Sequence, residues 1–241
     1  GRIEHLWYEI DFDTLQRATT ASTRLFMLCN PHNPVGRAFT REELLALSDF
    51  CERYDLTICS DDNHCDLLLD GAQYTPIASL SPETAMRTIT LIAPSKTFNL
   101  AGLKCGIAIT QNSELRKLLQ AASVGIVSQV NVFGYVAALA AYRDCGDWVA
   151  ALCDHLTENR DFLAKYLTDR LPEVDFTFPE ATYLVWIDCR RSGIQGNPQK
   201  FFLEHAKVAL NDGTRFGQGG KGFVRLNFGC TRAMLEQALA Q

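Results

Sequence analysis

The sequence predicts an α/β fold, because short apolar runs alternate with amphipathic helical segments over residues 1–145. Runs of this kind are typical of strands that are buried on both faces of a parallel or mostly parallel sheet. The four predicted strands are 24–29, 57–60, 88–93 and 105–110. Beyond about residue 145, one long helix leads into a smaller set of strands and helices, which predicts a second, α+β unit over 146–241.

Turn and cap signals give the elements of the first unit. The first strand ends in the segment 30–36, where two prolines and a glycine predict a loop. A helix is expected to begin after Thr40, because Glu43 completes a capping box. The buried stripe of that helix would consist of Leu44, Leu47 and Cys51. The second strand ends at Asp61, and Pro94-Ser95-Lys96 follows the third.

The second unit begins with a helix over 147–171, which Pro172 is expected to end. The elements predicted after it are an extended segment at 176–178, a strand at 183–188, a helix at 199–209, a strand at 223–228 and a helix capped by Thr231. The glycine-rich run 217–222 lacks the strand-then-helix setting of a nucleotide-binding fingerprint, which favours a flexible surface turn.

Composition and charge narrow the class of protein. The chain has 241 residues, is 47% hydrophobic and carries a net charge of -5, so a disordered tail or a generic binder of nucleic acids or membranes is not expected. We see no membrane span and no signal peptide, and we expect a cytoplasmic location. The nine cysteines form no CxxC pair, which favours buried thiols over disulfides or a zinc site.

Polar side chains follow three successive predicted strands: Asn33, Asp61 and Lys96. Ligands of doubly wound sheets bind beyond the carboxyl ends of the strands. One polar residue at such a place would mean little, but an amide, a carboxylate and a lysine at three successive ends are an unusual combination. The sequence therefore predicts a small-molecule site at this edge.

Five runs carry a family resemblance: 29–36 (CNPHNPVG), 60–64 (SDDNH), 95–102 (SKTFNLAG), 207–213 (KVALNDG) and 222–232 (GFVRLNFGCTR). In this order they resemble the fold-type I enzymes that depend on pyridoxal 5'-phosphate (PLP). Within the class I/II aminotransferase superfamily, the chain is similar to the cystathionine β-lyase-like branch, of PatB/MalY type. The resemblance implies that residues 1–145 are the C-terminal part of the PLP-binding large domain and that 146–241 are the small domain.

The resemblance also implies roles for the strand-end residues. Lys96 would bind the PLP aldehyde covalently and serve as the base at the substrate Cα, roles that only an amine with a tuned pKa can combine. Asp61 would pair with the pyridine nitrogen, and Asn33 would hydrogen-bond the phenolic oxygen. The plainer alternatives are a surface lysine, a helix N-cap and an Asx turn.

Five further residues are candidates by the same resemblance. His64 would contact the phenolic oxygen, or be a buried structural histidine. Ser95 and Lys104 are candidates for the cofactor phosphate. Arg225 would bind the substrate α-carboxylate bidentately, the alternative being a surface ion pair. Tyr183 would lie on the substrate side, with core packing as an equal alternative.

The chain also departs from the family pattern. Family members are longer at the N-terminus, where they carry a glycine-containing phosphate loop and an aromatic residue that stacks on PLP. This chain is expected to begin inside the large domain, and its incomplete sheet would expose an edge or an apolar face. Asp62-Asn63 stand where relatives carry Glu-Ile, Ala181 where they carry Gly, and Ala93 where some carry a hydroxyl.

Three functions follow from the resemblance. The first is a PLP-dependent carbon–sulfur β-lyase that acts on L-cystathionine or L-cysteine-type amino acids and gives a thiol, pyruvate and ammonia. The second is an aminotransferase on the same scaffold. The third is a catalytically incompetent fragment that acts through association. The expected partners are an amino-acid substrate and a second copy of the chain, with no metal, nucleic acid or membrane.

Overall fold

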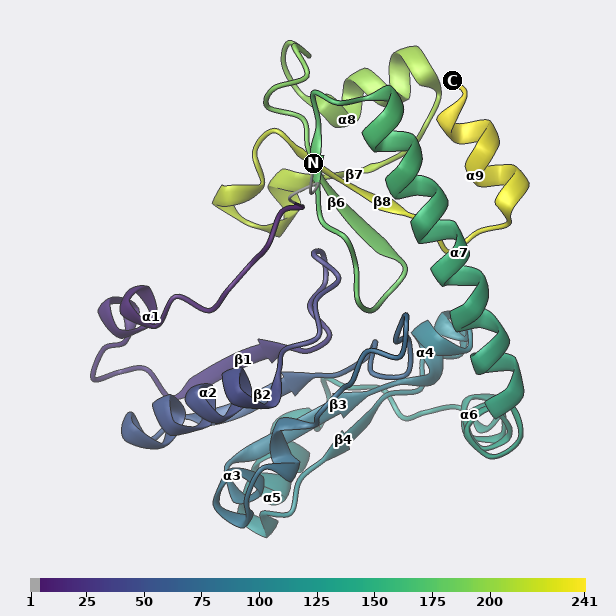
Figure 1. Cartoon of the computed structure of the whole chain (residues 1–241). Helices are drawn as coiled ribbons and strands as arrows, with labels where there is room; N and C mark the ends of the chain where they lie inside the picture. Colours follow the sequence, from purple (N-terminus) through teal and green to yellow (C-terminus); the bar gives the residue numbers. More distant parts are fainter. Residues whose placement is uncertain (1–4) are drawn as a thin grey trace.

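Two β-sheets joined by a long helix make up the part of the chain that the computed structural model describes, residues 5–241 (Figure 1). The first sheet has the order β1-β2-β3-β4, and its strands are β1 (Leu25–Cys29), β2 (Thr57–Asp61), β3 (Thr88–Ile92) and β4 (Ile107–Ile109). The pairs β1–β2 and β2–β3 are parallel, and β3–β4 is antiparallel. The predicted α/β fold with a mostly parallel sheet is confirmed.

The helices around the first sheet are α1 (Phe12–Ala18), α2 (Arg41–Arg53), α3 (Pro82–Met86), α4 (Pro94–Thr97) and α5 (Ser113–Ser123). Helix α2 begins after Thr40, and both hydrogen bonds of the predicted capping box with Glu43 are present. The predicted stripe is 0% exposed at Leu44, Leu47 and Cys51. It packs with Leu28 of β1 and Ile58 of β2, which anchors α2 on one face of the sheet.

The prediction that the first sheet is buried on both faces is wrong for the described residues. Successive residues of a strand point to opposite faces. In β1, Leu28 is buried, whereas Leu25 and Met27 are 48% and 76% exposed. Cys59 of β2 lies beside Met27 on this open face and is only partly buried. Since the apolar residues of α1 and α2 pack on the other face, the expectation of an uncovered apolar face is confirmed.

Helices α6 (Val132–Asp144) and α7 (Gly146–Arg170) lead to the second sheet. Figure 1 shows α7 passing from the level of the first sheet to the second, with α9 (Arg232–Leu239) beside it. Leu156 and Leu163 of α7 are fully buried in the core of the second unit. No described helix, α7 included, is long and apolar enough to cross a membrane.

The second sheet is antiparallel throughout and has the order β5-β6-β8-β7. Its strands are β5 (Asp175–Phe176), β6 (Leu184–Asp188), β7 (Asn211–Asp212) and β8 (Phe223–Asn227). Helix α9 begins after Thr231, as predicted. The helix predicted over 199–209 is shorter: α8 (Pro198–Phe201) continues as a π-helical turn that stops at Lys207, where a φ of 58° breaks the right-handed helix.

The glycine-rich run 217–222 belongs to the connection between β7 and β8, and it lies at the surface over 217–219, as expected, whereas Gly220 is buried against Gly213. A methyl group added to Gly213 would come within 2.2 Å of the carbonyl oxygen of Gly220. Gly217 has a φ of 116°, a conformation that favours glycine. The contact between two bare backbones closes the connection and brings β7 against β8.

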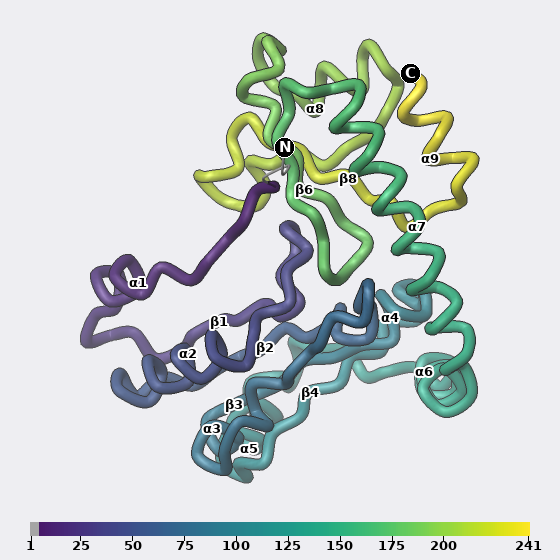
Figure 2. Tube along the Cα trace, in the orientation of Figure 1, coloured from purple at the N-terminus to yellow at the C-terminus, as the bar shows by residue number. Residues whose placement is uncertain are grey.

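Two segments from the first half of the chain pack against the second sheet. The backbone N–H of Leu6 donates to the carbonyl of Phe176 over 3.0 Å. Figure 2 shows the first described residues beside the second sheet before the chain reaches α1. Leu67 and Leu69, which follow β2, are buried in the core of the second unit. Segments on both sides of residue 145 therefore tie the two sheets together.

Candidate active site

The carboxyl ends of β1, β2 and β3 lie at one edge of the first sheet. The strands are parallel, and their register pairs Cys29 with Asp61 and Asp61 with Leu91. Asn33 follows β1 in its loop, Asp61 is the last residue of β2, and Lys96 lies in α4 just after β3. The three residues singled out from the sequence therefore follow neighbouring strands at the same edge.

Arg225 reaches this edge from β8 of the second sheet. Its Nη1 donates to Oδ1 of Asn33 over 2.7 Å. On its other side, Nη2 and Nε donate to Oδ1 of Asn211 over 2.8 and 3.2 Å. The ring of Phe216 lies 4.7 Å from the guanidinium carbon. No ion pair among residues 5–241 involves Arg225, so its positive charge is held by neutral groups.

His64 is a buried residue, 5% exposed, and its imidazole is neutral near pH 7. Burial, together with the positive charges of Lys96 and Arg225, lowers its pKa to about 4, and the charge of Asp61 opposes this shift. These three charges therefore all act on one imidazole. The Nδ1 atom of His64 is buried and has no hydrogen-bond partner among the described residues. Such an atom is a candidate ligand contact.

Two adjacent carboxylates at the end of β2 have opposite surroundings. Asp61 is exposed, and its Oδ1 accepts from Nδ2 of Asn63 over 2.6 Å. Asp62 is 1% exposed and accepts from the hydroxyls of Ser60 and Tyr74. Burial raises the pKa of Asp62 to about 6. Asp61 is thus the carboxylate that a ligand can reach, and Asp62 belongs to the interior.

Helix α4 presents Lys96 and Ser95 next to each other. Lys96 is exposed and Ser95 is partly buried. Thr97, the next residue, is buried, and its hydroxyl donates to Oδ2 of Asp66 over 2.9 Å. This bond ties α4 to the segment after β2, in which His64 also lies. The two segments that carry Lys96 and His64 are therefore anchored to each other.

Lys104 stands apart from the other candidates. It is exposed and lies at the end of a 3-10 turn with a left-handed φ of 50°. Its ammonium group makes no ion pair with the described residues, and no hydrogen bond among residues 5–241 joins it to another candidate residue. The structure thus brings Ser95 next to Lys96 and leaves Lys104 without a link to the group.

Tyr183 lies just before β6 and packs against both the core and the site. Its ring meets the His64 ring edge-on, with the centroids 5.4 Å apart. It also packs against the apolar core of the second unit. Burial raises the pKa of its hydroxyl, and the charge of Arg225 opposes this. Tyr183 therefore packs in the core and also lies beside His64 of the candidate site.

Three residues at the site were not among those singled out from the sequence: Asn63, Asn211 and Phe216. Asn211 lies in one of the five runs quoted above, and it is paired with Arg225 across β7 and β8. The signal that could have found Asn211 is the short connection between β7 and β8, because two antiparallel strands joined in this way place Asn211 opposite Arg225.

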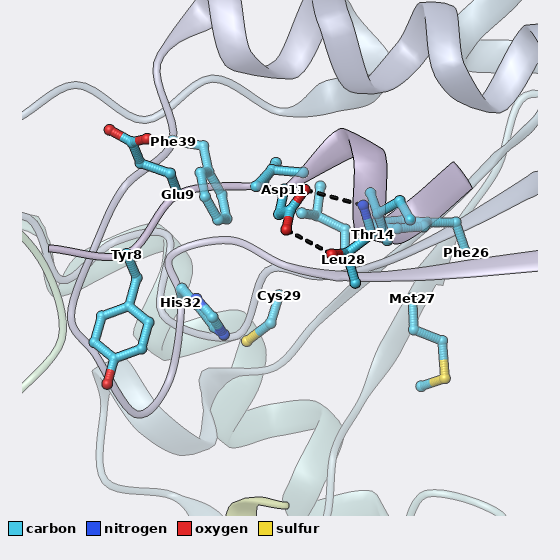
Figure 3. Close-up of a pocket in the computed structure, with 12 residues that line it drawn as sticks. Tyr8, Glu9, Asp11, Thr14, Phe26, Met27, Leu28, Cys29, His32 and Phe39 are labelled. Carbon is cyan, nitrogen blue, oxygen red and sulfur yellow. Dashed lines mark hydrogen bonds between the residues drawn. The ribbon is translucent and has the colours of Figure 1, made fainter. Parts of the chain in front are cut away.

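A separate cavity of about 320 Å³ lies between α1 and β1 and contains none of the candidate residues. Figure 3 shows Cys29 and His32 in it, between Tyr8 and Met27. Burial raises the pKa of the Cys29 thiol to about 11 and lowers the pKa of His32. Both groups are therefore neutral near pH 7, and the cavity offers no activated nucleophile.

Comparisons with known proteins identify the family to which the chain belongs. Residues 5–241 match the family model "Aminotransferase class I and II". The chain is 40% identical over 236 residues to the cystathionine beta-lyase PatB of Bacillus subtilis (strain 168), covering 96% of this chain and 61% of PatB. The chain thus spans about three fifths of the length of this relative.

Solved structures show the same fold over almost the whole chain. The crystal structure of OvoB matches with a TM-score of 0.92 and 43% identity, covering 99% of this chain and 62% of that one. Cystalysin from Treponema denticola, whose structure contains a pyridoxal 5'-phosphate cofactor, matches with a TM-score of 0.92 and 30% identity, covering 97% and 60%. With the family model matched along the described residues, the chain belongs to the aminotransferase class I and II family, with the α/β fold of its PLP-dependent members.

Proposed function

We propose that the protein is a PLP-dependent carbon–sulfur β-lyase that acts on L-cystathionine or L-cysteine-type amino acids and releases a thiol, pyruvate and ammonia. The observation that carries the proposal is that Asn33, Asp61 and Lys96 follow three neighbouring strands at one edge of the first sheet, where Arg225 of the second sheet donates a hydrogen bond to Asn33. The similarity to PatB, a cystathionine beta-lyase, favours the lyase over the aminotransferase.

The residues of the site fit the chemistry of PLP. The exposed amine of Lys96 suits an aldehyde, and the exposed carboxylate of Asp61 suits a protonated ring nitrogen. The amide of Asn33 presents its oxygen to Arg225, which leaves its two N–H groups to donate to the phenolic oxygen. The unpartnered Nδ1 of His64 supplies a further polar contact in the same place.

The side chains of the site then divide the tasks of the reaction. Bound PLP supplies an electron-accepting ring. Asp61 holds a proton at the pyridine nitrogen, and Arg225 binds the substrate α-carboxylate and so fixes the direction of the Cα–H bond. Lys96 Nζ removes the Cα proton, after which the Cβ–S bond of the substrate breaks and its electron pair leaves on sulfur, which takes up a proton to give the thiol. One water molecule then hydrolyses the remaining three-carbon fragment to pyruvate and ammonia. His64, neutral at pH 7, contributes no charge that would compete with these groups.

Ser95 and Lys104 are proposed to face the cofactor phosphate. A hydroxyl and an ammonium group are both suitable partners for a phosphate. Ser95 has the stronger support, because it is adjacent to Lys96 in α4. Tyr183 is proposed to line the substrate side of the site, since its ring contacts His64.

The proposed domain boundary near residue 145 rests on the two separate sheets. The first sheet uses strands up to Ile109 and the second uses strands from Asp175 onward. The segments around Leu6 and Leu67 pack with the second sheet, so the large domain would supply residues to the cores of both sheets. A cytoplasmic location is proposed as well: all nine cysteines lie in the described part, and all are free thiols.

The proposed homodimer is supported by the apolar surface of α6. Phe133, Val136 and Leu139 are 72%, 62% and 61% exposed. Exposed apolar residues in such number on one helix mark a surface that is covered by a partner. Light scattering of the full-length protein would give twice the monomer mass, and Val136→Glu would lower it. A monomer at micromolar concentration would contradict the dimer.

The activity is tested on the full-length protein loaded with PLP. Reduction with borohydride followed by peptide mapping is expected to find the cofactor on Lys96, and Lys96→Ala is expected to abolish both the label and pyruvate release from L-cystathionine. Transfer of the amino group to a keto acid, without pyruvate release, would identify an aminotransferase. A label on another lysine would contradict the assignment.

A further inference from the structure

We propose that Asn211 is a positioning residue, which turns the guanidinium of Arg225 so that its free N–H groups meet the substrate carboxylate. This rests on the proposed role of Arg225 as the carboxylate-binding residue. Asn211 touches no reacting atom in this scheme and acts through Arg225 alone.

The hydrogen bonds of Arg225 within the protein leave two of its N–H groups for a ligand. A guanidinium has five N–H groups. Asn211 Oδ1 accepts from Nε and Nη2, and Asn33 Oδ1 accepts from Nη1. Two N–H groups remain, one on each terminal nitrogen, and both can donate to a carboxylate. Because Asn211 holds the Nε side, the guanidinium cannot rotate without breaking two bonds.

Asn211 is itself held firmly. It pairs with Arg225 across β7 and β8, in a ladder that continues from Asp212 to Val224. Asp212 in turn accepts from Nδ2 of Asn197 over 2.7 Å and from the backbone of Thr214 over 3.0 Å. The close backbone contact between Gly213 and Gly220 closes the same connection. The amide oxygen at position 211 therefore has a fixed place relative to Arg225.

The neutral amide of Asn211 orients the guanidinium of Arg225 without neutralising its charge, which a carboxylate at the same position would do. None of the ion pairs formed by residues 5–241 supplies a negative charge to Arg225. The full positive charge is thus kept for an anionic ligand. Asn211→Asp would preserve the shape and the hydrogen bonds and would cancel that charge.

The experiment measures binding of a simple carboxylate and kinetics in parallel. Propanoate, which has a carboxylate and no amino group, is titrated calorimetrically into the full-length PLP-loaded protein. Asn211→Ala is expected to weaken propanoate binding and to raise KM for L-cystathionine, each by roughly tenfold, the size of a lost hydrogen bond to a charged group. The kcat should stay within about twofold, since the residue is not expected to act in the chemical step.

The variants are matched to separate the possible outcomes. Gln195→Ala removes an exposed amide that donates to the carbonyl of Gly193 and takes no part in holding Asn211 or Arg225, and it is expected to leave both values unchanged. Asn211→Asp keeps the side-chain shape, so it serves if Asn211→Ala does not fold, and it is expected to weaken propanoate binding more than Asn211→Ala does. Wild-type affinity in Asn211→Asp would overturn the argument from charge.

Propanoate binding by Arg225→Ala and Asn211→Ala tests the roles of these two residues separately. If Arg225→Ala loses propanoate binding and Asn211→Ala does not, Arg225 remains the carboxylate-binding residue and the role of Asn211 is wrong. If Arg225→Ala binds propanoate normally, the proposed function of Arg225 itself fails. A lowered melting temperature in Asn211→Ala with unchanged binding would mean a structural role only and would overturn the proposal.

Discussion

Arg225 donates from Nη1 to the side-chain oxygen of Asn33 over 2.7 Å, although 192 positions separate the two residues in the sequence. Asn33 belongs to the loop after β1 and Arg225 to β8, so the bond joins the two sheets. Val35 of the same loop packs with Trp186 and Phe223 of the second sheet. The orientation of the guanidinium therefore depends on how the sheets are packed together, and not on β8 alone.

The first prediction concerns this bond. Asn33→Ala in the full-length protein is expected to raise KM for L-cystathionine roughly tenfold, because Arg225 loses one of its two orienting partners. Steady-state kinetics check it, with urea unfolding to confirm that the fold is kept. Asn112→Ala, which removes an N-cap of α5 away from the site, is the control. An unchanged KM in Asn33→Ala would separate the bond from substrate binding.

The second prediction is a pH dependence with two opposing parts. The pKa of His64 falls from 6.5 to about 4 on folding, so its contribution to stability is present above pH 6.5 and is lost as pH falls towards 4. The pKa of Asp62 rises from 3.8 to about 6, so its contribution is lost as pH rises through 6 and returns as pH falls. Each shift changes the free energy of unfolding by about 3 kcal/mol. The two changes have opposite signs and occur over almost the same pH range, between about 4 and 6.5.

Single substitutions are expected to reveal the two parts. His64→Gln removes the group whose protonation destabilises the fold at low pH. The free energy of unfolding of this variant is therefore expected to increase relative to that of wild type as pH falls from 6.5 to 4. Asp62→Asn removes the stability that wild type regains as Asp62 becomes protonated. The free energy of unfolding of this variant is therefore expected to fall more steeply than that of wild type as pH falls over the same range. Urea unfolding of the PLP-free protein at pH 7, 6 and 5 measures both. Parallel curves for wild type and His64→Gln would contradict the low pKa of His64.

Local patterns predicted most elements of the fold, because each such element depends on residues close together in the chain. The capping box at Thr40 and Glu43 and the N-cap at Thr231 are both present as expected. Helix α1 was not predicted, and its seven residues, Phe12–Ala18, are too few to give a clear periodic signal. The reversed direction of β4 depends on the course of the chain over 93–106, which apolar content does not encode.

The candidate site was predictable to the extent that it follows parallel strands. Asn33, Asp61 and Lys96 share an edge because β1, β2 and β3 run in the same direction. The partners of Arg225 were not predictable in this way, because they depend on sheet packing and on the β7–β8 connection. The uncovered face at Met27 was expected from the resemblance and not from the strand itself, which is apolar on both sides.

The third prediction tests the interior carboxylate. Tyr74→Phe removes the hydroxyl that donates to Asp62 and leaves a buried acceptor with one partner fewer. The free energy of unfolding is expected to fall by about 1–3 kcal/mol. Because that hydrogen bond also lowers the pKa of Asp62, the variant should titrate this carboxyl at a higher pH. Tyr54→Phe, at the end of α2, is the matched control, with an expected change within about 0.5 kcal/mol.

The last prediction concerns two glycines of the β7–β8 connection that differ only in their surroundings. An added methyl group on Gly213 would meet the Gly220 carbonyl oxygen at 2.2 Å, whereas one on Gly219 would meet nothing within 4 Å. Gly213→Ala is therefore expected to lower the free energy of unfolding by about 2 kcal/mol or more, and Gly219→Ala to change it by about 0.5 kcal/mol or less.

The same pair of variants also reports on the site. Gly213 directly follows β7, so forcing its backbone away from Gly220 moves Asn211 relative to Arg225. Gly213→Ala should raise KM for L-cystathionine together with its loss of stability, and Gly219→Ala should leave KM unchanged. Urea unfolding and steady-state kinetics on the full-length protein measure both quantities. Equal behaviour of the two variants would mean that the packed connection does not control the position of Arg225.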